Sequence, residues 1–68
     1  MQEQEYDWII WVGGGYGDFE FRGTAAEAEE VRRCKANWEG APARKFCLPL
    51  NGKDAAALAS CRESTARY

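Results

Sequence analysis

The side chains that could support catalysis or bind a metal are few, because the chain contains three cysteines and no histidine. Histidine is the commonest general base and the commonest metal ligand, so its absence removes most hydrolytic mechanisms. Cys34, Cys47 and Cys61 are widely spaced and form no CxxC pair of the kind that binds structural zinc. No activating neighbour of a thiol is evident. We therefore expect reduced cysteines in an apolar core, with no metal, no cofactor and no catalytic residue.

A glycine-rich segment and three carboxylates are the other residues that could do chemistry. Residues 13–17, GGGYG, resemble a phosphate-binding loop in composition, but such loops lead from a strand into a helix N-terminus. Here a strand pattern follows, which favours a hairpin turn. Asp7, Asp18 and Glu20 could bind a cation or act as an acid–base pair, but a small sheet offers no deep cleft for such chemistry. We interpret them as solvated charges.

The element that would position these residues is a predicted β-hairpin over residues 6–22, YDWIIWVGGGYGDFEFR. Residues 6–12 are rich in aromatic and β-branched side chains, which predicts a strand, and the apolar side chains on both faces are typical of a central strand. The glycines allow the chain to reverse. Residues 18–22 alternate apolar and charged side chains, which predicts a half-buried second strand.

A helix is predicted after the hairpin, because Thr24 to Glu27 forms a capping box. Gly40 and Pro42 should end it. Its expected apolar stripe, with a lysine stem at the edge, consists of Ala25, Ala28, Val31, Cys34, Lys35 and Trp38.

The remainder of the chain predicts a third strand over residues 43–48 and a short helix from Ala55 to about Glu63, capped by Asp54. Residues 1–5 carry no periodicity and are expected to be frayed. The fold class is therefore α+β, as one small domain over residues 1–68 in the order β-β-α-β-α.

A right-handed crossover between the second and third strands gives the strand order 2-1-3, with the main helix on one face of the sheet. The core under this helix is expected to contain Tyr6, Trp8, Ile10, Val12, Phe19, Phe21, Phe46 and Leu48. The other face is expected to be open, with cover by the last helix as the alternative that the sequence leaves undecided. It would hold Ile9, Trp11 and Cys47 among the charged residues Asp7, Asp18, Glu20, Arg22 and Lys45.

The composition is that of a folded globular domain, with 46% hydrophobic and 29% charged residues. A chain of 68 residues buries only about 60% of its unfolded surface, so a partner or a second copy would help to stabilise it. No apolar run approaches the ~20 residues of a membrane span, and the N-terminus lacks the pattern of a secretory signal. We expect a soluble, cytoplasmic protein. Its charge is uneven, with eight acidic residues and one basic residue in positions 1–30.

The function that fits most of these features is non-enzymatic protein binding, because aromatic residues with a charged rim are typical of interfaces. The expected contact residues lie on the open sheet face and the hairpin, and are Ile9, Trp11, Tyr16, Asp18 and Glu20. A homodimer through the sheet edges or the open face is also consistent with the pattern.

The alternative is a small nucleic-acid-binding regulator. Its contacts would be the basic residues of the first helix and third strand, Arg32, Arg33, Arg44 and Lys45. The acidic hairpin and the net charge of −2 disfavour it, because nucleic-acid binding depends on neutralising phosphates.

In size and layout the chain resembles the small accessory proteins of bacteriophages and mobile elements, including anti-CRISPR inhibitors. The segments that carry this resemblance are YDWIIWVGGGYGDFEFRGTAAEAEEVRRCKANWEG and ARKFCL. The resemblance implies a non-catalytic inhibitor that occupies a surface of a host defence complex, where an acidic face would take the place of phosphate. It assigns no role to an individual residue.

Overall fold

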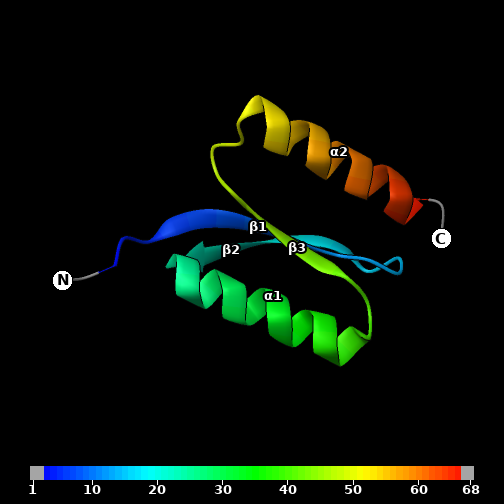
Figure 1. Ribbon diagram of the computed structural model, residues 1–68, viewed down its shortest axis with the longest axis horizontal. Helices are drawn as coiled ribbons and strands as arrows, with labels where there is room; N and C mark the ends of the chain where they lie inside the picture. Colours follow the sequence, from blue (N-terminus) through cyan, green and yellow to red (C-terminus); the bar gives the residue numbers. More distant parts are fainter. Residues whose placement is uncertain (1–2, 67–68) are drawn as a thin grey trace.

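The computed structural model describes residues 3–66, and its elements follow in the predicted order β-β-α-β-α (Figure 1). They are β1 (Tyr6–Val12), β2 (Gly17–Gly23), α1 (Ala25–Glu39), β3 (Ala43–Cys47) and α2 (Gly52–Ala66). The three strands are antiparallel neighbours in the order β2-β1-β3. The predicted fold class and strand order are confirmed. Of the expected frayed segment, residues 3–5 have no regular secondary structure, and residues 1–2 lie outside the described residues.

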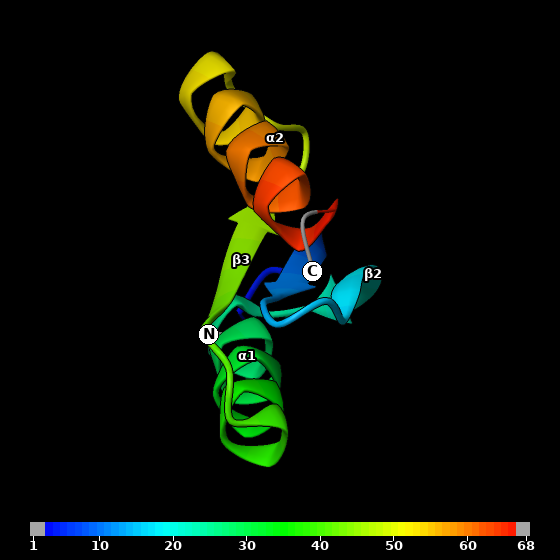
Figure 2. The ribbon, with the colours of Figure 1, turned by 90° about the vertical axis from the view of Figure 1, so that its right-hand side faces the viewer.

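The two helices lie on opposite faces of the sheet, so the molecule has three layers (Figure 2). On the α1 side, Trp8, Ile10 and Val12 of β1 form a cluster with Ala28 and Ala43. The second cluster lies on the α2 side and consists of Ile9, Trp11, Phe46, Leu58 and Cys61. The expectation of an open sheet face is therefore wrong, and the alternative of cover by the last helix is confirmed, because Leu58 and Cys61 of α2 pack on this face. The apolar character of both faces of β1 reflects a strand that is covered on both sides.

The face assignment of β3 is also different from the prediction. Ile9 is paired with Phe46 and Trp8 with Cys47, and paired residues share a face of the sheet. Phe46 and Leu48 therefore pack on the α2 side, while Cys47 and Lys45 lie on the α1 side. A shift of one residue moves every side chain of a strand to the other face. Because apolar side chains lie on both faces of β3, the alternation of apolar and polar residues did not show which face packs under α1.

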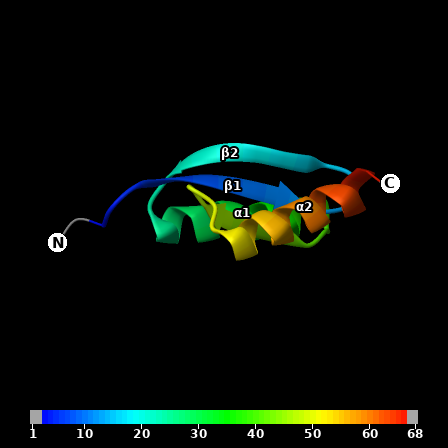
Figure 3. The ribbon, with the colours of Figure 1, turned by 90° about the horizontal axis from the view of Figure 1, so that it is seen from above.

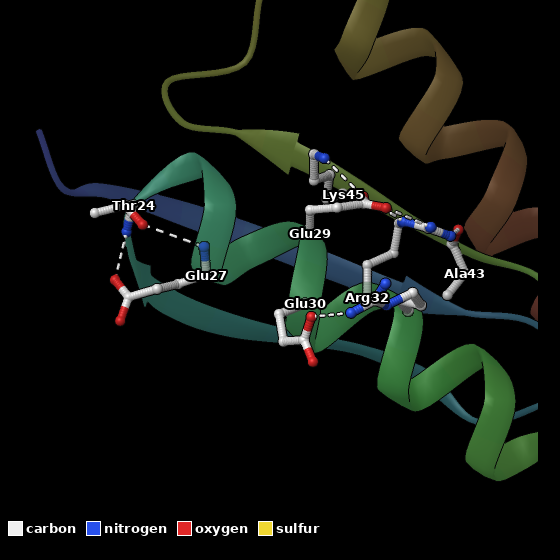
Figure 4. Close-up of polar contacts among 8 residues, drawn as sticks. Thr24, Glu27, Glu29, Glu30, Arg32, Ala43 and Lys45 are labelled. Carbon is white, nitrogen blue, oxygen red and sulfur yellow. Dashed lines mark hydrogen bonds and ion pairs between the residues drawn. The ribbon is translucent and has the colours of Figure 1, made fainter. Parts of the chain in front are cut away.

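The first helix begins with the predicted capping box. The Thr24 Oγ1 atom accepts a hydrogen bond from the Glu27 N–H at 3.1 Å, and the Thr24 N–H donates to the Glu27 carboxylate at 2.9 Å (Figure 4). The helix ends at Gly40, whose φ of 63° lies in the left-handed region that glycine adopts easily. Both ends of α1 agree with the sequence pattern.

The orientation of α1 about its axis differs from the predicted stripe. Ala28 is its only fully buried residue, and Cys34, Lys35 and Trp38 are exposed. The small Ala28 side chain packs in the same cluster as Ala43 of β3. The stripe prediction is therefore wrong for the second half of the helix and also for Ala25, which is exposed.

The second helix is longer than predicted and starts earlier. The Asn51 side chain accepts a hydrogen bond from the Asp54 N–H at 2.7 Å, so Asn51 rather than Asp54 caps it. Leu58 and Cys61 are its buried side chains among those described. Within residues 3–66, neither helix has the length and apolar character that a bilayer crossing requires.

The strand β2 runs along one edge of the molecule and is mostly exposed (Figure 3). Phe19, which was expected in the core, is 37% exposed, and Tyr6 at the start of β1 is 39% exposed. Phe21 is half-buried against the α1 cluster. An edge strand and the end of the central strand therefore leave large aromatic side chains partly in solvent in this narrow sheet.

Candidate protein-interaction surface

The sheet residues that were expected to contact a partner are buried within the protein. Ile9 is 8% exposed and Trp11 is 7% exposed, because both pack beneath α2 against Leu58. A partner cannot reach either side chain while α2 is in place. Their assignment to an exposed contact surface is a mistake that follows from the expectation of an open face.

The other three expected contact residues are exposed but do not form one site. Asp18 and Glu20 lie on the α2 side of β2, where the Arg62 guanidinium donates to the Asp18 carboxylate at 2.7 Å. Tyr16 in the hairpin turn instead lies beside Glu39 at the end of α1, and this carboxylate raises the pKa of the Tyr16 phenol. The predicted set is therefore divided between the two sides of the sheet.

The basic residues of the alternative nucleic-acid site are also divided, and most are paired (Figure 4). Arg32 donates two hydrogen bonds to the Glu29 carboxylate, at 2.7 and 2.8 Å, and Lys45 binds the same carboxylate at 2.8 Å. Arg33 is paired with Glu30. The remaining residue, Arg44, is on the opposite face of the sheet from Lys45, with its guanidinium 5.1 Å from the centre of the Phe46 ring. These residues form no continuous cationic surface.

The contacts of Glu29 predict a dependence of stability on acidic pH. Hydrogen bonds from Arg32 and then Lys45 lower the pKa of the Glu29 carboxyl from 4.5 to about 2. Because the folded-state pKa is depressed, this contribution to stability is present above pH ~4.5 and is lost as the pH falls toward 2. As the pH is lowered from about 4.5 toward 2, we expect the melting temperature of Glu29→Gln to fall less than that of the native chain. Thermal unfolding followed by circular dichroism measures this, and Glu30→Gln, which removes a carboxylate with one arginine partner, is the control.

A group of exposed aromatic residues was not identified from the sequence, although one member, Tyr16, was among the expected contact residues. Trp38 of α1 is 84% exposed, Tyr16 is 60% exposed, and Phe19 of β2 lies beneath the Lys35 ammonium, which is 5.7 Å from the ring centre. We call this group, with two smaller neighbours on α1, the aromatic surface. Its members are Tyr16, Phe19, Val31, Cys34, Lys35 and Trp38.

Two shallow hollows meet at Lys35 and join the members of the aromatic surface. The larger hollow, of about 460 Å³, is lined by Glu30, Val31, Cys34, Lys35 and Trp38. The smaller, of about 190 Å³, lies between β2, the hairpin turn and the end of α1, and both Tyr16 and Phe19 line it. The surface is therefore continuous from the middle of α1 to the hairpin.

No disulfide joins the three cysteines within residues 3–66, and only part of the expectation for them is correct. Cys61 is buried and Cys47 is half-buried, but Cys34 is exposed on the aromatic surface and is no core residue. In the part of the chain that the structure describes, no three acidic or cysteine side chains come together as a metal site would require. Comparisons of the chain with protein families, with curated proteins and with solved structures found no match.

Proposed function

We propose that this chain is a non-catalytic protein-binding module and that it binds through the aromatic surface. The observation that carries the proposal is the exposure of Trp38, whose indole stands in solvent at the rim of an apolar hollow. Tryptophan is among the residues that contribute most to binding energy in interfaces, because its large ring loses much water on contact. A folded domain gains nothing for its own core from a tryptophan in this position.

The surroundings of Trp38 support the same function. Val31, Cys34 and the stem of Lys35 extend the apolar area along α1. Glu30, Arg33 and Glu39 lie around it as charged residues. An apolar centre with a polar rim is the usual anatomy of a protein interface. The surface also lies on a capped helix, so little ordering is needed on binding.

The more specific function of an inhibitor of a host defence complex in the cytoplasm rests on the resemblance of size and layout. In that function the acidic sheet face would imitate phosphate. Asp7 is paired with Arg22 at 3.0 Å and Asp18 with Arg62 at 2.7 Å, which reduces the negative charge that this face presents. The aromatic surface is therefore better supported as the contact region than the acidic face. The nucleic-acid alternative is less well supported, because Arg32, Arg33 and Lys45 are paired with glutamates.

The test is a comparison of tagged proteins in quantitative affinity capture from cells of the source organism. We expect Trp38→Ala to lose the bound protein, whether that protein is a different chain or a second copy. Tyr6→Ala, which removes an aromatic side chain outside the aromatic surface, should retain it. Circular dichroism should show the same helix content in all three proteins. Equal capture by the native chain and Trp38→Ala would contradict the proposal.

A further inference from the structure

We propose that the outer edge of β2 pairs antiparallel with the same edge of a second copy of this chain, so that two sheets of three strands join into one. This interface is separate from the function proposed above, because Tyr16 and Trp38 take no part in it. Figure 2 shows β2 at the margin of the sheet, with neither helix extending past its outer side. Another strand can therefore reach this edge.

The outer edge of β2 carries backbone groups that can bind a further strand. On β1, the Asp7 carbonyl accepts a hydrogen bond from the Leu48 N–H, on the β3 side, at 2.8 Å. Because successive residues of a strand point their backbone groups to opposite sides, the even-numbered residues of β1 bond to β2. They are paired with the odd-numbered residues of β2, so the even-numbered ones point outward. These are Asp18, Glu20 and Arg22, and within residues 3–66 no other segment bonds to their backbone groups.

The other edge strand, β3, is less suited to such pairing. It has five residues, against seven in β2. The backbone groups of Ala43 point away from β1, and the Arg32 guanidinium donates to the Ala43 carbonyl at 3.1 Å. A side chain bound to this carbonyl obstructs an incoming strand at one end of β3. The edge that a second chain can extend is therefore β2.

The charges of β2 favour a second copy in one register. A twofold axis through Phe21 places Glu20 opposite Arg22 of the second copy, and this contact is made twice. Both side chains lie on the α2 side, because their partners on β1 are Ile9 and Asp7. Glu20 is the charged residue of β2 that has no ion pair within residues 3–66. Arg22 binds Asp7 through Nη1, so the rest of its guanidinium can bind a second carboxylate.

The two neighbouring registers fit less well. An axis through Phe19 would place Asp18 opposite Glu20 of the second copy, and an axis through Glu20 would place the two glutamates opposite each other. Like charges directly opposite destabilise a strand pair. In the register centred on Phe21, Asp18 instead comes opposite Thr24, whose φ of −74° and ψ of 166° continue the extended backbone. This register alone among the three places no like charges opposite each other.

The α1 side of the joined strands is apolar. Phe19 is 37% exposed and Phe21 is half-buried on this side, so both have surface left to cover. A Cβ atom at Gly23 would lie 2.9 Å from the Phe21 ring, which shows that this ring covers the glycine. Phe19 of the second copy comes opposite Gly23 and so contacts the same ring. Four phenyl rings therefore meet where the two β2 strands join, and aromatic pairs across strands stabilise a sheet.

The joined sheet would present the aromatic surface twice. The twofold axis is perpendicular to the sheet, because Phe21 of both copies lies on the same face. Both α1 helices then lie on that face, and each carries its own Trp38. A partner with two binding sites would be held more tightly by the dimer than by one copy.

The first experiment is sedimentation equilibrium of the native chain, Glu20→Arg, Arg22→Glu and the double variant. We expect the native chain to dimerise and each single change to weaken dimerisation about tenfold, because like charges then meet twice. The double variant should recover the native dissociation constant. The pairing with Asp7 is still lost in the double variant, so recovery reports the contact between the copies.

Amide hydrogen exchange at high and low protein concentration locates the interface. We expect the amides of Glu20 and Arg22 to be protected in the dimer and to exchange rapidly in the monomer. The Lys45 amide points outward from β3 and should exchange rapidly at both concentrations. Protection of Lys45 without protection of Glu20 and Arg22 would place the contact on the other edge and overturn the inference.

The remaining outcomes separate this inference from the proposed function. A native chain that is monomeric at about 1 mM overturns the β2 pairing, as does a double variant that dimerises no better than the single ones. Trp38→Ala should dimerise like the native chain, so loss of the dimer in that variant also contradicts the pairing. The proposed function fails on a different result, which is unchanged protein capture by Trp38→Ala.

Discussion

Replacing Trp11 by alanine is expected to lower the free energy of unfolding by about 3–5 kcal/mol, the usual cost of truncating a large buried aromatic side chain. Trp11 is 7% exposed and packs in the same cluster as Ile9, Phe46 and Leu58. Its removal leaves a cavity between the sheet and α2. A domain of 68 residues has a total stability of roughly 3–10 kcal/mol, so this change should remove a large part of it.

The measurement is urea unfolding followed by circular dichroism, at protein concentrations low enough for the chain to be monomeric. Trp38→Ala is the matched control, because it removes the same side chain from an exposed position. We expect its stability to change by no more than about 0.5 kcal/mol. Similar shifts of the unfolding midpoint for both variants would show that Trp11 is not a core residue.

The contrast between Trp11 and Trp38 also explains why the site was predicted in the wrong place. Both faces of β1 were recognised as apolar, and this is the pattern of a strand covered on both sides. The sequence between residues 52 and 66 is rich in alanine, and its burial depends on Leu58 and Cys61 alone among the described side chains. Such a weak stripe left undecided whether this helix would cover the sheet.

The side of α1 that faces the sheet was mispredicted for a geometric reason. The expected stripe advanced from Ala28 to Cys34 in two steps of three residues. Each such step falls about 60° short of a full turn, so the two residues are about 120° apart around the helix. Ala28 meets the sheet, and Cys34 therefore faces solvent. Apolar residues that recur on average every 3.6 residues lie on one side of a helix, so this spacing would have distinguished the side of α1 that meets the sheet from its outer side.

Local rules predicted the parts of the fold that depend on neighbouring residues. The bounds of β1, the glycine turn, the capping box at Thr24 and the end of α1 at Gly40 all follow from short-range sequence chemistry. The face of β3 and the cover over Ile9 depend on contacts between distant segments. Those contacts are decided by packing, which a single sequence does not reveal.

Replacing Leu58 by alanine should detach α2 from the sheet. Leu58 is 1% exposed and is the largest described side chain that α2 buries, so we expect a loss of about 2–5 kcal/mol. The α1 side of the sheet does not depend on this residue, because its cluster is formed by Trp8, Ile10 and Val12 with the first helix. The variant should therefore retain the sheet and α1 while α2 opens locally.

Amide hydrogen exchange distinguishes local opening from global unfolding. In Leu58→Ala we expect the amides of residues 55–66 to exchange rapidly, while those of residues 8–12 in the central strand remain protected. Arg62→Ala, which removes the exposed ion pair with Asp18, should have a much smaller effect on the same amides. Opening of α2 would also expose Ile9 and Trp11, so an apolar dye should bind the Leu58→Ala variant. Equal loss of protection in the central strand and in α2 would mean that the three layers unfold together, and that α2 is an integral part of the core.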